Sequence, residues 1–198
     1  SDLHASLGVP LNISEITVTA REDLGNDNLD SLIVLSDICN RLGTDTISTG
    51  SCVAFATECF ENGIITEKDT GGLKLAWGDH KAIVALTQMI GRREGFGQVL
   101  ADGVKVAAER IGNGAERYAM HIGGQEIAGH DPRGGWNFAT GYGTDPTPGR
   151  HNQGGGGCPA GIGVPPVDDA ERKGRGEYHK ASTNYLHAAS ALGLCHFV

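Results

Sequence analysis

Residues 27–43 read DNLDSLIVLSDICNRLG, and their apolar side chains recur at helical spacing. Asp27 and Asn28 are good residues to cap the start, because a short polar side chain accepts hydrogen bonds from the free N–H groups of a first turn. Gly43 can end the helix, because glycine adopts the positive φ of a common helix terminus. The stretch therefore predicts one helix with an apolar face.

Several further stretches repeat this pattern of a polar start, an apolar face and a closing glycine. The predicted helices run from Thr46 or Ser48 to Gly63, from Asp79 to Ile90, from Gly97 to Ile111 and from Lys180 to Ala191. A short alternation at Leu73–Leu75, bracketed by glycines, fits a small hairpin or an extended link. Since the periodic stretches are helical, we predict a mainly α, multihelical fold with long irregular Gly/Pro-rich loops and at most a minor β-hairpin.

The chain between residues 123 and 166 breaks the helical pattern. It carries 14 of the 31 glycines between 123 and 163, and six of the seven prolines between 132 and 166, so we predict neither a regular helix nor a central strand there. Disorder is one interpretation, but Trp136, Phe138 and Tyr142 favour order, because disordered segments are poor in aromatic residues. We therefore predict an ordered, site-forming loop over 131–153.

The composition argues against several classes of protein. Sixteen basic and 24 acidic residues give a net charge of −8, which disfavours a nucleic-acid partner. No apolar run approaches the roughly 20 residues of a membrane span, and the first residues lack a signal-peptide pattern. We expect a soluble, cytoplasmic protein. Its five cysteines form no CxxC motif, so neither a disulfide framework nor a self-contained zinc site is indicated.

Two of the predicted helix ends are alike, NRLGTD at 40–45 and SALGLC at 190–195. In each, a glycine turns the chain off a helix, and two residues later come a carboxylate, Asp45, or a thiol, Cys195. This geometry directs the side chain away from the helix axis, where it can meet a ligand. An ordinary helix terminus and a buried core thiol are the alternatives.

The whole pattern resembles the tungsten-containing aldehyde ferredoxin oxidoreductase family over nearly the entire chain. Seven stretches carry the resemblance in order and spacing: 40–50 (NRLGTDTISTG), 58–66 (ECFENGIIT), 69–78 (DTGGLKLAWG), 93–103 (REGFGQVLADG), 124–133 (GQEIAGHDPR), 141–152 and 193–197 (GLCHF). The resemblance implies that 1–122 and 123–198 are parts of the second and third domains of the family. It also implies that the chain is an internal piece of a longer enzyme.

In that family, helix ends of the type DxxGLD and DxxGLC hold the two pterins of a tungsten, less often molybdenum, bis-pyranopterin, and the cysteine completes a [4Fe–4S] cluster. The resemblance implies that Asp45 hydrogen-bonds a pterin and that Cys195 ligates iron. Its further cofactor-binding residues would be Asn40, Ser190, Gly193 and Leu194. Asn40 and Ser190 replace the acidic first position of each motif, so each motif loses a carboxylate acceptor.

The other three cluster cysteines of the family, and its N-terminal domain that forms the base of the cofactor site, have no counterpart in these residues. We therefore expect the isolated chain to bind neither the pterin cofactor nor an intact cluster.

The resemblance also implies two catalytic residues, His151 and, by an ungapped count, Glu15. A carboxylate and an imidazole suit aldehyde oxidation, because a base must take protons from the attacking water while a donor polarises the carbonyl oxygen. A solvent-exposed loop histidine and a surface carboxylate are the alternatives. Arg133 and Arg150 are candidates for anchoring pterin phosphates, whereas His130 and Cys158 receive no role.

By the resemblance, the parent protein would oxidise aldehydes to carboxylic acids and pass the electrons to ferredoxin, and it could form a homodimer. Two alternatives stay open. The chain could belong to the tungsten subunit of an aromatic acyl-CoA reductase, or it could be an inactive helical scaffold without a cofactor.

Overall fold

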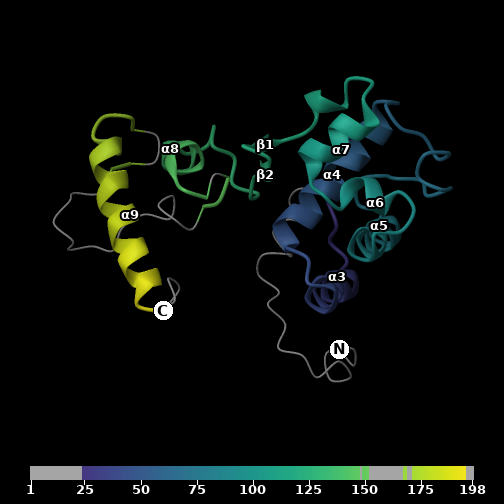
Figure 1. Ribbon diagram of the computed structural model, residues 1–198, viewed down its shortest axis with the longest axis horizontal. Coiled ribbons are helices and arrows are strands. Elements are labelled where there is room, and N and C mark those ends of the chain that lie inside the picture. The colour runs from purple at the N-terminus through teal and green to yellow at the C-terminus, as the bar shows by residue number, and fades with distance from the viewer. Residues whose placement is uncertain (1–23, 148, 152–166, 169–170, 195–198) are drawn as a thin grey trace. The chain divides into compact units, whose positions relative to one another are not determined.

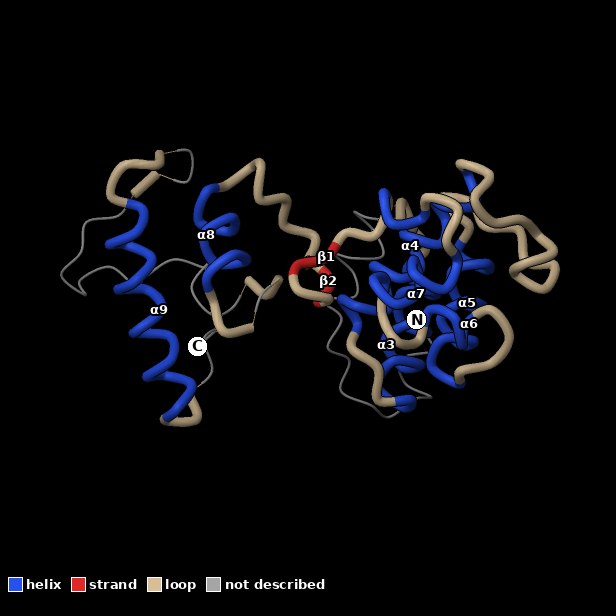
Figure 2. The backbone as a smooth tube through the Cα atoms, turned by 45° about the horizontal axis from the view of Figure 1, so that its top comes forward, coloured by secondary structure: helices blue, strands red, loops and turns tan. Residues whose placement is uncertain are grey.

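A computed structural model describes residues 24–147, 149–151, 167–168 and 171–194 (Figure 1). The regular structure of these residues consists of seven α-helices, one short 3-10 helix and a two-stranded antiparallel hairpin. Figure 2 shows how far the helices outweigh the two short strands. The predicted mainly α fold with a minor hairpin is thereby confirmed.

The described residues divide between Gly129 and His130 into two compact units. The assignment of 1–122 and 123–198 to two domains of the family stays a prediction. None of the helices in the described ranges has the length and apolar character that a membrane span requires.

The first unit contains most of the regular structure. Its elements are α3 (Leu29–Leu42), α4 (Thr46–Glu61), α5 (His80–Arg92), α6 (Gly97–Leu100), α7 (Val104–Ile111), the 3-10 helix η2 (Ala115–Arg117) and the strands β1 (His121–Ile122) and β2 (Gln125–Glu126). In the hairpin, His121 pairs with Glu126 and Ile122 with Gln125.

Side chains cap three of these helices: Asn28 and Asp79 are predicted start residues, whereas Asp45 lies directly before the predicted start of α4. Asn28 accepts a hydrogen bond from the Ser31 N–H at the start of α3, and Asp45 accepts one from the Ser48 N–H at the start of α4. Asp79 accepts hydrogen bonds from two N–H groups of α5. Each cap satisfies backbone donors that the first turn leaves unpaired.

One continuous apolar cluster fills the first unit. Leu35, Val53, Leu86, Leu100 and Val104 are each at most 2% exposed, and they come from α3, α4, α5, α6 and α7 respectively. Full burial of such a side chain contributes about 1.5–3 kcal/mol. The cluster thus fixes the helix ends at which the pocket described below is formed.

The single helix predicted over Gly97–Ile111 is wrong, because the chain forms α6 and α7 with a break at Asp102–Gly103. Gly103 has a φ of 90°, and the Val104 N–H that follows donates to Oε1 of Glu126 at 2.8 Å. A side chain distant in sequence therefore caps α7, which apolar periodicity cannot reveal. At Leu73–Leu75, the extended link is the interpretation that holds, and the hairpin lies at 121–126 instead.

The second unit contains α8 (Trp136–Thr144) and α9 (Arg175–Ala191). Helix α8 corrects the prediction that no regular helix forms between residues 123 and 166. All six prolines of this segment lie outside the helix, the two nearest being Pro132 and Pro146. Within the helix, the Thr140 and Thr144 hydroxyls donate to carbonyls one turn earlier. Helix α9 begins at Arg175, ahead of the predicted Lys180.

Candidate functional site

The first helix end, at the junction of α3 and α4, has the predicted turn. Gly43 has a φ of 67°, and the Thr44 N–H donates to the Cys39 carbonyl at 3.0 Å. A Cβ on Gly43 would meet nothing within 4 Å, so neighbouring atoms leave room for a side chain there. Glycine is favoured at this position because of the positive φ alone. Asp45 follows at once, and its Oδ2 accepts from the Ser48 N–H at 2.8 Å.

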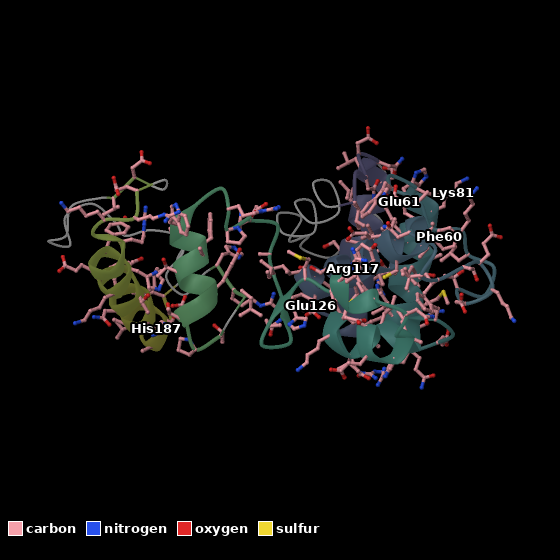
Figure 3. The ribbon with its side chains drawn as sticks, turned by 90° about the horizontal axis from the view of Figure 1, so that it is seen from above. Phe60, Glu61, Lys81, Arg117, Glu126 and His187 are labelled. Atoms are coloured by element: carbon pink, nitrogen blue, oxygen red, sulfur yellow. The ribbon has the colours of Figure 1, made fainter. Side chains whose placement is uncertain are left out.

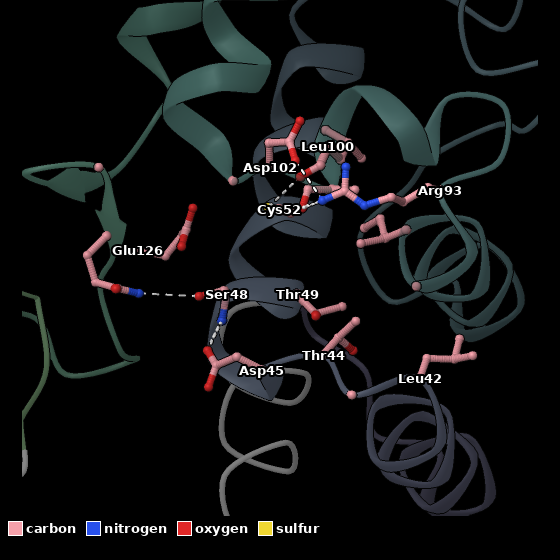
Figure 4. A pocket seen from close by; sticks show the side chains of 17 residues that line it. Leu42, Thr44, Asp45, Ser48, Thr49, Cys52, Arg93, Leu100, Asp102 and Glu126 are labelled. Atoms are coloured by element: carbon pink, nitrogen blue, oxygen red, sulfur yellow. Dashed lines mark hydrogen bonds and ion pairs between the residues drawn. The ribbon is translucent and has the colours of Figure 1, made fainter.

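A pocket of about 480 Å³ opens beside this turn (Figure 4). It lies between the end of α3, the start of α4, the end of α5, the junction of α6 and α7, and the hairpin. Its polar lining includes Asp45, Ser48, Thr49, Arg93, Asp102, Gln125 and Glu126. Across the pocket, Nε2 of Gln125 donates to the Ser48 hydroxyl at 3.5 Å.

Glu126, whose side chain is labelled in Figure 3, belongs to the lining of this pocket. It is a buried carboxylate, with 3% of its surface exposed. Its Oε1 accepts from the Val104 N–H at the start of α7, where a helix favours negative charge. A Cβ on Gly103 would lie 2.5 Å from the same oxygen. Glycine at 103 therefore permits both the positive φ and the close approach of the carboxylate.

The thiols near the pocket are unsuited to nucleophilic or metal chemistry. Burial raises the pKa of the Cys52 thiol, the Glu126 carboxylate raises it further, and Sγ of Cys52 donates to the Leu100 carbonyl at 3.5 Å. Burial also raises the pKa of Cys39. Such thiols stay protonated at neutral pH. Within the described ranges, no three His, Cys, Asp or Glu side chains are grouped so as to hold a metal ion.

The lining of the pocket is rich in hydrogen-bond acceptors. Carboxylates, hydroxyls and an amide oxygen face the space, whereas the cation Arg93 is tied to Asp102 with an Nη2–Oδ1 distance of 2.6 Å. Such a lining suits a ligand that presents several N–H groups and little negative charge. Asn40, predicted to assist, is exposed in the last turn of α3 and does not line the pocket.

The second helix end repeats the turn of the first. Gly193 has a φ of 72°, and the Leu194 N–H donates to the Ala189 carbonyl at 3.0 Å, the same spacing as Thr44 to Cys39. Ser190 and Leu194 are exposed there. Cys195 lies outside the described residues, as do Glu15 and Cys158.

His151 lies in an aromatic cluster of the second unit. Its ring centroid is 4.7 Å from that of His130 in an edge contact, and His130 stacks on Phe138 at 4.9 Å with an interplanar angle of 6°. Burial lowers the pKa of His151, and the positive charges that His130 and Arg150 can carry lower it further. The imidazole is therefore neutral near pH 7, so it can donate one hydrogen bond and accept a proton.

The other predicted cationic anchor, Arg133, is 88% exposed and holds Asp131, with Nη2 and Oδ2 2.6 Å apart. This pair lowers the pKa of Asp131 to about 2 and raises the pKa of Arg133. A phosphate at Arg133 would have to share the guanidinium with that carboxylate. Arg150, beside His151, is half-buried.

Sequence reasoning missed three groups at these sites. Glu126 and His130 both lie in the quoted stretch 124–133, but their roles depend on contacts made by the folded chain. Asp145 and His179 form a buried pair, with Oδ1 and Nε2 3.1 Å apart, between the end of α8 and the first turns of α9. No local sequence signal links residues so far apart.

Comparisons with known proteins identify the family of this chain. Residues 14–198 match the family model of aldehyde ferredoxin oxidoreductase, domains 2 and 3. The chain is 36% identical over 115 residues to the aliphatic sulfonate oxidoreductase, WOR-like subunit, of Pyrococcus furiosus, covering 56% of this chain and 18% of that protein. It is 36% identical over 140 residues to the tungsten-containing aldehyde ferredoxin oxidoreductase of Pyrococcus abyssi, covering 69% and 23%.

A similar solved structure is the active site complex of benzoyl coenzyme A reductase with 1,5-dienoyl-CoA. It has a TM-score of 0.59 and 26% identity, over 75% of this chain and 23% of that one. This chain thus spans about a fifth of the length of the curated relatives it matches.

Proposed function

Because the chain belongs to the aldehyde ferredoxin oxidoreductase family, we propose that it serves in the oxidation of an aldehyde to a carboxylic acid, with ferredoxin as electron acceptor. The aldehyde and water give the acid, two protons and two electrons. When bound, a tungsten, less often molybdenum, bis-pyranopterin supplies the two-electron oxidation, and a [4Fe–4S] cluster relays the electrons singly. One observation carries the proposal. The turn at Gly43, which holds Asp45 beside the pocket, recurs at Gly193, two residues before Cys195 in the sequence.

The pocket at the first helix end fits a pterin. A pterin presents an amino group and ring N–H groups, and the pocket offers the acceptors of Asp45, Gln125 and Glu126. Asp45 is fixed, because its carboxylate also caps α4. We propose that Asp45 orients one pterin, whereas the exposed Asn40 contributes less.

The second helix end would serve the other pterin and the cluster. Ser190, Gly193 and Leu194 form the turn, and Cys195 is the next residue in the sequence. We propose that Cys195 ligates the cluster iron. A [4Fe–4S] cluster takes four thiolates. That the isolated chain holds neither cofactor therefore stays a prediction, which metal analysis can test.

The proton chemistry is assigned to Glu15 and His151. A neutral imidazole can polarise the carbonyl oxygen through its N–H or take a proton, and the lowered pKa of His151 favours that neutral form. Arg150 and Arg133 are the proposed anchors for pterin phosphates.

A second candidate function is the reduction of an aromatic acyl-CoA. The structural similarity to the benzoyl coenzyme A reductase complex favours it, at 26% identity and a TM-score of 0.59. Assays of the full-length protein with aldehydes and ferredoxin, against assays with benzoyl-CoA and a strong reductant, separate the two functions. A cytoplasmic location and a homodimer stay predictions.

A variant that separates the two tasks of Asp45 tests the cofactor assignment. In the full-length protein grown anaerobically with tungstate, Asp45→Ser keeps an N-cap side chain but removes the carboxylate. We expect an unchanged melting temperature of the cofactor-free protein and, in the protein grown with tungstate, a loss of most bound tungsten. Asp79→Ser, the equivalent change at the start of α5, is the control and should keep its tungsten. Full tungsten content in Asp45→Ser would remove Asp45 from the site.

The catalytic assignment is tested by His151→Asn in the same protein. Asparagine keeps a donor but cannot carry an extra proton, so tungsten and iron should be unchanged and kcat should fall by roughly 10²–10⁴-fold. His80→Asn, in the first turn of α5, is the matched control. Normal turnover by a fully loaded His151→Asn enzyme would exclude the histidine from the mechanism.

A further inference from the structure

His130 lies between an aromatic helix face and His151. Its imidazole is parallel to the Phe138 ring, 6° between planes and 4.9 Å between centroids. Its centroid is also 4.7 Å from that of His151, at an interplanar angle of 66°. These are the parallel and edge-on arrangements in which aromatic rings attract each other.

Two residues of α8 hold His130 in place. Phe138 and Tyr142 are four residues apart, so they share one face of the helix. Tyr142 is 1% exposed, and its hydroxyl donates to the His130 carbonyl at 3.0 Å. The backbone and the ring of His130 are therefore both fixed by the same helix face.

His151 lacks such anchoring of its own. Its ring is half-buried, and Nδ1 is buried without a hydrogen-bond partner in the described part of the chain. No hydrogen bond to that nitrogen fixes the ring, so the ring contact with His130 limits its rotation. The groups that act on the charge of His151 are His130 and its neighbour Arg150, and both disfavour the protonated form.

We propose that His130 is a positioning residue for His151, acting as a fixed wall that sets the orientation of the His151 imidazole and keeps water from one side of it. This inference rests on the proposed function, because it takes His151 as the group that meets the substrate. His130 acts through His151 and needs no contact with the substrate.

The test compares two substitutions in the full-length, metal-loaded protein. His130→Phe keeps a flat ring that can stack on Phe138, whereas His130→Ala removes the wall. We expect His130→Ala to lower kcat by about 10- to 100-fold with little change in KM, since small misplacements of a catalytic group have effects of that size. His130→Phe should stay within about threefold of the parent, and His80→Ala should match the parent.

A second measurement does not depend on turnover. In the metal-free protein labelled at histidine Cε1, NMR titration should show that the pKa of His151 rises in His130→Ala, because burial and a neighbouring imidazole are both lost. His130→Phe keeps the burial, so it should give a smaller rise. If His130 had only a structural role, His130→Ala would unfold the second unit and would not selectively raise the pKa of His151.

The outcomes are distinct. Unchanged kcat in His130→Ala would overturn the positioning role, and so would a His130→Phe variant as impaired as His130→Ala, which would show that the imidazole itself is needed. Normal turnover in His151→Asn would instead overturn the proposed function. Loss of activity in His151→Asn and His130→Ala, with recovery in His130→Phe, supports both.

Discussion

The two compact units are stabilised in different ways. In the first, a continuous apolar cluster joins five helices, and Ala56, Cys59, Leu86, Leu100 and Ala107 are 0% exposed. In the second, the buried apolar side chains among the described residues are Tyr142 and Leu186. They are outnumbered there by buried polar ones, Asp145, Arg175, His179 and Ser182.

This difference teaches where each unit is sensitive to change. Stabilisation by apolar burial is non-directional, and it decreases when the volume of a buried side chain changes. Stabilisation by buried polar groups decreases when a single hydrogen-bond partner is lost. The first unit therefore gives the pocket rigid walls. In the second unit, His151 contacts the ring of His130, and the Tyr142 hydroxyl hydrogen-bonds the His130 carbonyl, so the geometry at His151 depends on a few residues.

The largest effect is expected from Gly97→Ala in the first unit. The new Cβ would lie 2.0 Å from the Met89 carbonyl carbon and 2.4 Å from the Ile90 nitrogen, and backbone atoms cannot move aside cheaply. We expect a loss of about 3 kcal/mol or more, measured as thermal unfolding by circular dichroism. Gly176→Ala in α9, with nothing within 4 Å, is the matched control and should be neutral or slightly stabilising. Equal melting curves for the two variants would contradict the contrast in packing.

The next effect concerns the buried pair of the second unit. His179→Leu leaves the Asp145 carboxylate, 2% exposed, without its imidazole partner, so we expect a loss of about 2–3 kcal/mol. Chemical denaturation measures this free energy of unfolding. Replacing Asp145 as well, in the double variant with leucine at both positions, should recover part of it, since the buried carboxylate is then absent. If the double variant lost the sum of the losses of His179→Leu and Asp145→Leu measured singly, the pair would not be coupled.

A smaller effect tests whether the two helix ends are copies of one turn. Gly43→Ala and Gly193→Ala each force alanine into a positive φ, and neither Cβ would meet an atom within 4 Å. We expect each to destabilise by about 1 kcal/mol, with the two values equal within error in chemical denaturation. A much larger loss at Gly43 would show that the first helix end relies on contacts that the second lacks.

The smallest effect is a difference in pH dependence. The lowered pKa of His151 means that the native protein binds fewer protons than the unfolded chain as the pH falls below the ordinary histidine value of about 6.5. The stability from neutral His151 is thus present above that pH and is lost below it. Burial raises the pKa of Cys59 to about 11, so this thiol destabilises the first unit only in alkali. His151→Asn should flatten the acid side of a melting-temperature profile, and an unchanged slope there would refute this origin.

Much of the first unit follows from local sequence rules. Apolar spacing located α3, α4 and α5, and polar residues marked the caps of α3 and α5 at Asn28 and Asp79. Helix α4 begins at the predicted Thr46, but its cap is Asp45, which was predicted only as a pterin contact. The break between α6 and α7 could not be predicted, because Glu126 makes it from 22 residues away. The sequence-based prediction missed helix α8, because it gave more weight to the high glycine content of the segment than to the absence of proline within 136–144.

The candidate site was predictable where it depends on a local turn. Gly43 and Gly193 adopt the positive φ that the two motifs implied. The resemblance pointed to His151, but its neighbour His130 has an ordinary sequence context. The rings of Phe138 and His151 come next to His130 only in the folded chain. The sequence therefore could not predict these contacts.

The hydrogen bond between Glu126 and the Val104 N–H has a consequence for folding cooperativity. The Glu126 carboxylate, from the hairpin, accepts a hydrogen bond from an N–H group in the first turn of α7. The hairpin and α7 therefore depend on each other for their folded conformations. Opening of the hairpin would release the α7 cap and remove one wall of the pocket in a single event. The exchange rate of the Val104 amide hydrogen therefore reports how often this wall opens, in solution and without any ligand present.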